Sequence, residues 1–256
     1  MARQLWGVGF GVCFLLSVAA EDAPKVAGVL SEQVGKSLEK ALEGRAQRGW
    51  PEGVPASEGG AVRLRLGAVD DGLRKDDALR DRLRAALEKA RLSEAEGDAP
   101  ALELSAYLCA GGATAWVRDP ERGRVLLVVR AQAASSSDSI GGAVKDFVQK
   151  LSRQAARGWP PHVLLGGDGK AVARLSSFSG PEDPVDARLQ LLEALVASEV
   201  LDVRDSTGAD PAEPPSLLLR GELVRDGDDR TVSLLAFDVV KKRVIVRSTT
   251  LTRTIR

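Results

Sequence analysis

The chain has 256 residues, of which 44% are hydrophobic and 28% are charged, and its 36 lysines and arginines balance 36 aspartates and glutamates. This composition is typical of a globular protein long enough for two domains, and it excludes a disordered or collagen-like chain. A formal net charge of zero provides no long-range field that would favour nucleic acid, so we expect no nucleic-acid partner.

Residues 1–20 have the pattern of a secretory signal. Arg3 supplies a positive start, residues 5–18 form a nearly continuous apolar run, and small residues precede Glu21. We predict cleavage after Ala20 and a periplasmic or secreted location. The apolar run is short for a spanning helix, so we expect no stable membrane anchor after cleavage. A retained inner-membrane anchor is the alternative.

The two cysteines indicate neither a lipid anchor nor a disulfide. Cys13 lies inside the apolar run between Val12 and Phe14, without the small-residue context of a lipidation site. Cleavage after Ala20 would leave Cys109 as a single thiol, which cannot form an intramolecular disulfide. Stability must therefore come from packing.

The tetrapeptide Arg48-Gly49-Trp50-Pro51 returns unchanged 109 positions later, at residues 157–160. Because the chain has only four tryptophans, this recurrence predicts a duplicated module of domain size. Glycine tolerates positive φ after a helix, an apolar residue then packs back on the last turn, and proline prevents continuation. We interpret Trp50 and Trp159 as parts of two helix stops. The alternative is a paired aromatic patch that binds a partner.

The segments around the two tetrapeptides match in order. An amphipathic helix precedes each, and an extended run, a second helix and three strands follow. Each module therefore reads α-β-α-β-β-β, which predicts an α/β (α+β) fold with mixed sheets in modules 21–134 and 135–256. Asp119 and Asp238 occupy equivalent places in the last hairpin turn. The predicted strands are 61–66, 102–108, 113–117 and 124–130 in the first module and 171–175, 217–223, 231–237 and 243–247 in the second.

Residues 125–129 are apolar at every position, which is typical of a strand covered on both faces. If helices cover one face of the first sheet, the other face needs a second cover. We expect the second module to provide it, with the two copies packed as a pseudo-symmetric pair.

Residues suited to catalysis or metal binding are scarce. His162, the only histidine, lies in a loop without a nucleophile motif beside it, so we predict no catalytic residue. Residues 166–171 fail the phosphate-loop pattern, because Leu164 and Ala171 occupy its first and last places. One histidine and one mature cysteine cannot build a metal site, and we predict no metal and no cofactor. A carboxylate calcium site at Asp70-Asp71 or at residues 226–229 is the alternative; the second segment is more simply a hairpin turn.

Clusters of aspartate stand where second helices are expected to begin. Asp76, Asp77 and residues 183–186 place carboxylates near the positive end of a helix. We therefore interpret them as capping residues.

The second module resembles a bacterial envelope family. Residues 171–178 form a strand ending in Phe178, residues 185–199 a long helix, and residues 200–205 a strand ending near Asp-Arg. A strand containing Gly221-Glu222 and a hairpin turn with Asp238 follow. This order is similar to the module shared by the curli-secretion lipoprotein, the outer-membrane activator of penicillin-binding proteins, FlgO-like flagellar lipoproteins and the TolB amino-terminal domain. The resemblance covers residues 140–256 and, less closely, 24–132. The family often has one module, and this chain has two.

The resemblance implies an exported bacterial protein without enzymatic activity that binds other envelope proteins as an accessory or scaffold module. Two alternatives stay open. One is an exported small-ligand binding protein with a pocket between the modules. The other is an exported hydrolase that uses carboxylates.

Overall fold

The computed structural model describes most of the chain, and the predicted signal, the joint at 133–139, the loop at 206–215, Asp76, Asp77 and Asp183 lie outside the described residues. The described residues are 23–51, 53–56, 62–71, 78–90, 92–95, 100–109, 111–132, 140–181, 184–205 and 216–253.

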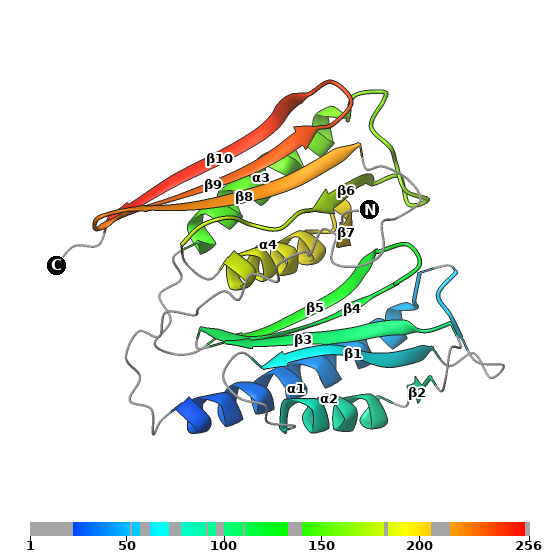
Figure 1. The fold of residues 1–256 in the computed structure, drawn as a ribbon. Coiled ribbons are helices and arrows are strands. Elements are labelled where there is room, and N and C mark those ends of the chain that lie inside the picture. Colours follow the sequence, from blue (N-terminus) through cyan, green and yellow to red (C-terminus); the bar gives the residue numbers. More distant parts are fainter. Residues whose placement is uncertain are drawn as a thin grey trace, which may run out of the picture.

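The first half of the chain forms a five-stranded sheet with two helices on one face, which we call the N-terminal unit (Figure 1). Its strand order is β2-β1-β3-β4-β5; β1 is parallel to β2 and β3, and β3, β4 and β5 are antiparallel. The buried leucines of α1 pack on the sheet because helical spacing places them on one stripe. Its elements are α1 (Ala23–Arg48), β1 (Arg63–Asp71), α2 (Ala78–Lys89), β2 (Ser93–Glu94), β3 (Leu102–Cys109), β4 (Gly112–Arg118) and β5 (Val125–Gln132).

The second half repeats this order of elements and is called the C-terminal unit. Its sheet has the order β10-β9-β8-β6-β7, with β6 parallel to both neighbours and β8, β9 and β10 antiparallel. The chain therefore has the predicted α/β class, with two mixed sheets. Its elements are α3 (Gly141–Arg157), β6 (Ala171–Leu175), α4 (Pro184–Ser198), β7 (Leu201–Asp205), β8 (Leu217–Asp226), β9 (Asp229–Asp238) and β10 (Arg243–Arg253).

The order α-β-α-β-β-β read from the repeat was wrong in one respect, since each unit has a further strand, β2 or β7, directly after its second helix. The strand at 200–205 that the family resemblance implied is confirmed by β7. Leu92 and Leu201 continue the apolar spacing of the preceding helices, so that spacing alone extends the helix too far. In the C-terminal unit the helix ends because Glu199 adopts a φ of 52°. Leu201 and Val203 are then buried at alternating positions, as in a strand.

The last hairpins of the two units share a detail of register. The pairing of β4 with β5 shifts between Val117 and Arg118, one position before Asp119, which leaves Leu126 as an extra residue. The pairing of β9 with β10 shifts at the corresponding place before Asp238. Matching bulges are what a duplication would leave behind, because bulges are built features of a strand pair. The duplication itself stays a prediction.

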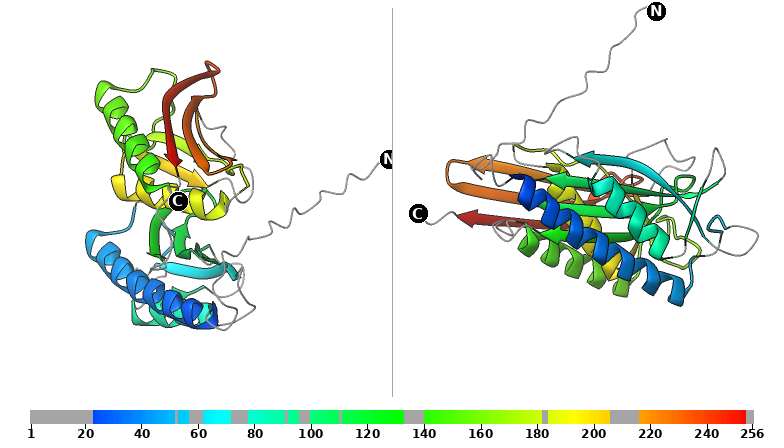
Figure 2. Two further views of the ribbon diagram at one scale, coloured as in Figure 1. Left: turned by 90° about the vertical axis from the view of Figure 1, so that its left-hand side faces the viewer. Right: turned by 90° about the horizontal axis from the view of Figure 1, so that it is seen from below.

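The two units stack with unlike surfaces in contact. Helix α4 lies between the two sheets, and α3 packs beside it against β9 and β10 (Figures 1 and 2). The layers therefore run from α1 and α2 to the first sheet, then α4, then the second sheet. The second unit covers the first sheet, as expected. It does so with its helices and not with its own sheet, so the expected pseudo-symmetric packing of the two copies was wrong.

Candidate protein-binding surface

The face of the first sheet that points away from α1 and α2 is occupied, and we call it the covered face. Tyr107, Cys109 and Val125 on this face belong to the hydrophobic core of the C-terminal unit, and Trp116 and Val128 pack against that core. The prediction that residues 125–129 are covered on both sides is confirmed. Leu126 and Val129 point to the opposite core, that of the N-terminal unit.

A charged pair fixes α4 on the covered face. Arg130 Nη2 lies 2.8 Å from Asp186 Oδ1 and 3.0 Å from Oδ2, and Gln190 Nε2 donates to the same carboxylate at 2.9 Å. Glu193 lies one helical turn further along α4, and burial raises its pKa although the charge of Arg130 opposes that shift. A recess of about 270 Å³ lies beside these groups, lined by Arg130, Gln132, Gly141, Val144, Gln190, Glu193 and Ala194.

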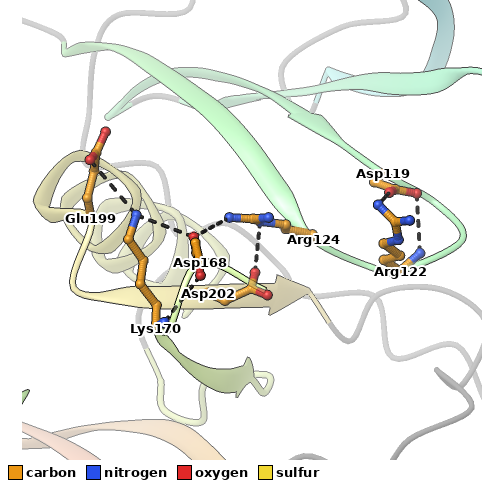
Figure 3. Close-up of polar contacts among 7 residues, drawn as sticks. All are labelled: Asp119, Arg122, Arg124, Asp168, Lys170, Glu199 and Asp202. Carbon is orange, nitrogen blue, oxygen red and sulfur yellow. Dashed lines mark hydrogen bonds and ion pairs between the residues drawn. The ribbon is translucent and has the colours of Figure 1, made fainter. Parts of the chain in front are cut away.

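A second polar cluster joins the units where their sheet edges meet (Figure 3). Arg124 Nη2 lies 2.9 Å from Asp168 Oδ2, and Arg124 Nε lies 3.0 Å from Asp202 Oδ1. Lys170 lies between Asp168 and Glu199, at 3.6 and 3.9 Å. Two carboxylates of the C-terminal unit thus contact one arginine of the N-terminal unit.

The pKa values of Asp168 and Asp202 are shifted in opposite directions. Burial raises the pKa of Asp202, and the nearby Arg124 and Arg204 offset only part of that effect. Burial also acts on Asp168, but the N–H of Lys170 and the charge of Arg124 outweigh it and hold the pKa of Asp168 below its ordinary value. The cluster is therefore a structural junction, in which each acid has a basic neighbour.

Backbone contacts extend this junction. The N–H of Asp205 donates to the carbonyl oxygen of Gly123 at 2.8 Å, and a single antiparallel bridge joins Arg124 to Arg204. At this one point the edge strands β5 and β7 shield each other's unpaired backbone groups.

The corresponding face of the second sheet is exposed, and we call it the open face. Cross-strand pairing places Arg220, Leu235 and Arg247 in one row, and Val224, Thr231 and Leu251 in another. Among the described residues no helix packs on this side of β8, β9 and β10, because α3 and α4 lie on the other side (Figure 2). Val224, Val244 and Leu251 have exposed fractions of 46%, 44% and 56%.

The open face is the structural counterpart of the covered face. Trp116 lies three residues before Asp119 and pairs with Val128, and Leu235 lies three residues before Asp238 and pairs with Arg247. The same side of the same hairpin therefore carries α4 in one unit and, within the part of the chain that the structure describes, no helix in the other. Sequence reasoning missed this surface. The polar residues 248–250 in the last strand were a signal that the two faces of the second sheet differ.

The two predicted aromatic residues, Trp50 and Trp159, lie far apart in the chain and in separate cores. Each is half-buried and packs on the core of its own unit. Helices α1 and α3 end at Arg48 and Arg157, and the following Gly49 and Gly158 have φ values of 84° and 90°. Because each tryptophan packs on its own core directly after a helix end, we keep the helix-stop interpretation as a prediction.

His162 contacts a buried acid. Its Nε2 lies 2.8 Å from Asp238 Oδ2, and the other oxygen of Asp238 accepts the N–H of Lys241 at 2.9 Å. Asp238 has an exposed fraction of zero. Asp119, at the equivalent place in the N-terminal unit, accepts two backbone N–H groups of its own turn. His162 is therefore held against a hairpin turn, a contact that the loop pattern alone does not show.

The remaining motifs have simple structural places. Residues 166–170 form a turn that leads into β6, and residues 226–229 form the turn between β8 and β9, where Gly227 has a φ of 59°. Within the described residues, no three histidine, cysteine, aspartate or glutamate side chains gather as a metal site would need. None of the described helices combines the length and the apolar character needed to cross a membrane.

Comparisons with known proteins find little. No protein-family model matches the sequence, and no curated protein matches it. The LpoB C-terminal domain from Escherichia coli matches at 12% identity and a TM-score of 0.28, over 43% of this chain and 99% of that one. The LpoB C-terminal domain from Salmonella enterica matches at 10% identity and a TM-score of 0.17, over 85% and 96%. Neither TM-score is high enough to carry an argument about fold or function.

Proposed function

We propose that this chain is an exported, non-enzymatic protein of the bacterial envelope that binds other envelope proteins through its open face. The observation that carries the proposal is the equivalence of the open and covered faces. One of them already serves as a binding surface for a helix within this molecule. The other has the same strand order and the same bulge in its last hairpin, and it exposes apolar side chains around arginines.

The composition of the open face supports this role. Protein interfaces are enriched in arginine and aromatic residues at their centres and surround them with polar residues. Arg220 and Phe237 are neighbours on this face, with the guanidinium carbon 5.9 Å from the centre of the ring. Ser233 and Thr249 provide hydroxyl groups nearby.

The proposal of export is based on the sequence of residues 1–20. The proposal of a non-enzymatic role is based on the basic partners that the described carboxylates contact. Asp186, Asp202 and Asp205 each lie beside an arginine at the junction or in the core of the C-terminal unit. Asp238 lies beside His162. Paired acids of this kind favour a structural role over the hydrolase alternative.

A small-ligand binding role is the second candidate, because the recess beside Arg130 is lined by both units. At about 270 Å³ it is smaller than the 300–1,000 Å³ that is usual for ligand pockets. Its arginine is already bound to Asp186. We therefore favour the open face.

Site-specific photo-cross-linking tests the proposed function. A benzophenone amino acid replaces Thr249 on the open face or, as the control, the exposed Gln33 on α1. We expect a discrete cross-linked envelope protein from position 249 and none from position 33. Equal products from both positions, or none from 249, would contradict the proposal. Loss of the same product in a Gln132→Trp variant that fills the recess would favour the small-ligand candidate.

A further inference from the structure

We infer that the open face takes an acidic amphipathic helix of its partner, laid across the strands as α4 lies across the covered face. This inference rests on the proposed function and names the chemistry of the partner. Three observations carry it: the way α4 is held, the charges of the open face, and the charges of this chain's own helices.

Helix α4 shows how this sheet geometry receives a helix. Asp186, Gln190 and Glu193 have spacings of four and three, which places them on one stripe. Asp186 contacts Arg130 directly, and Gln190 and Glu193 line the recess beside it. Leu189, Ala194 and Val196 flank this stripe and contribute to the core against the covered face. The opposite side of α4 carries Leu192, Leu195 and Arg188, and Arg188 binds Asp205 within the C-terminal unit. Carboxylates thus meet the arginine, and apolar residues fill the surrounding contact.

The open face offers arginines in the row next to Thr249, which is the counterpart of Arg130. Arg220 and Arg247 are exposed and stand on either side of Leu235 in one cross-strand row. Glu222 in the next row and Asp226 at the far end of β8 are exposed acids on the same side, so the basic part of the open face is the row of Arg220 and Arg247. Arginine binds carboxylates through a planar fork of donors and loses little water on burial, so a pair of arginines around a leucine favours a helix with carboxylates beside apolar residues.

A second copy of this chain has the wrong charge for the open face. Helix α1 carries five basic and three acidic residues, and α2 carries four basic and two acidic ones. Stacking these helices on the open face would bring basic side chains against Arg220 and Arg247. Two copies meeting through their open faces would bring the same arginines together. Like charges in such contacts repel each other, so the occupant is a different, acidic protein.

The test uses the full chain with benzophenone at position 249 in its native cells, followed by mass spectrometry of the cross-linked peptide. The variants are Arg220→Glu with Arg247→Glu, the conservative Arg220→Lys with Arg247→Lys, and a control with the same charge change on α1, Lys36→Glu with Lys40→Glu. Circular dichroism verifies the fold of each variant.

We expect the cross-linked peptide to be acidic with helical apolar spacing. The glutamate variant should lower the yield about tenfold, equivalent to about 1.4 kcal/mol. The lysine variant should keep most of the yield, and the control should keep all of it. Three results would overturn the inference: a peptide without carboxylates, a product with this same chain, or equal losses in the glutamate variant and the control. A missing product at position 249 would instead remove the proposed function, on which the inference depends.

Discussion

Arg130 of β5 and Asp186 of α4 belong to different units, and Nη2 of the arginine lies 2.8 and 3.0 Å from the two carboxylate oxygens. Only 7% of the arginine side chain and 17% of the aspartate side chain are exposed. The pair is therefore largely removed from water, and each partner depends on the other for its charge to be tolerated.

Replacing Arg130 with alanine should destabilise the protein by about 2–4 kcal/mol, because it leaves Asp186 buried without its main cation. Gln190 also donates to Asp186, which limits the loss. Urea unfolding of the full chain measures the effect. The matched control is Lys36→Ala, which removes an exposed pair with Glu32 and should change stability by about 0.5 kcal/mol or less. Similar losses in the two variants would show that the pair between units contributes little.

Reactivity of Cys109 should report on the contact between the units. Cys109 is 3% exposed and lies on the covered face, so a thiol reagent reaches it only when the units separate or the sheet opens. Arg124→Ala leaves Asp202 without its ion-pair partner and should speed labelling about tenfold or more. Arg84→Ala, which removes an exposed contact on α2, is the control. An unchanged labelling rate in Arg124→Ala would exclude a role of this cluster in holding the units together.

Asp238 should make stability depend on pH in the acid range. Burial raises its pKa, but the N–H of Lys241 and the contact with His162 lower it more, so the pKa lies below the ordinary 3.8. A carboxyl group whose pKa is lower when folded stabilises the protein above its unfolded pKa, and this stability is lost as pH falls through the folded pKa. Thermal unfolding between about pH 5 and pH 2 should therefore show a smaller acid loss in Asp238→Asn than in the unchanged protein.

Other acids, including the raised Glu193 and Asp202, contribute equally to both proteins in that comparison. A steeper acid loss in Asp238→Asn would contradict the assignment. His162→Ala should lower stability by about 1–3 kcal/mol, since it leaves a buried carboxylate with one hydrogen bond fewer. It should leave partner binding intact, because His162 lies in the loop before β6 and contacts the turn after β9.

The two repeated tryptophans should act through packing. Full burial would predict losses of about 3–5 kcal/mol on replacement by alanine. Because Trp50 and Trp159 are half-buried, we expect about 1–3 kcal/mol for each, measured by urea unfolding. Cross-linking from position 249 should not change in either variant. Loss of cross-linking with unchanged stability would show that both residues belong to the binding surface.

The order of helices and strands follows from local patterns, and this explains why most of the fold could be predicted. Apolar residues on one helical stripe define α1 and α3, and alternating or continuous apolar runs define β3, β4, β5, β8 and β9. Apolar spacing alone did not separate the short strands β2 and β7 from the helices before them, because Leu92 and Leu201 fit both spacings. Only the family resemblance placed a strand at 200–205, where β7 lies. A positive φ at Glu199, which no residue type there demands, ends α4.

The binding surface depends on information that a local pattern does not contain. Arg130 and Asp186 are 56 positions apart, and nothing near either residue identifies the other. One signal was present: α4 is apolar on all sides except for a few charges, which is typical of a helix buried on two sides. That signal predicts a helix between two layers, and it would have distinguished the covered face from the open one.

Because helices of one unit rest on the sheet of the other, the molecule has two dissimilar ends and hence a direction. A further unit could be added at the sheet end if its pair of helices packed on the open face. That end is therefore the place where the protein could be extended by engineering. A third unit copied from residues 140–253, or a synthetic helix carrying the carboxylate stripe of α4, would be the natural candidate to cap it.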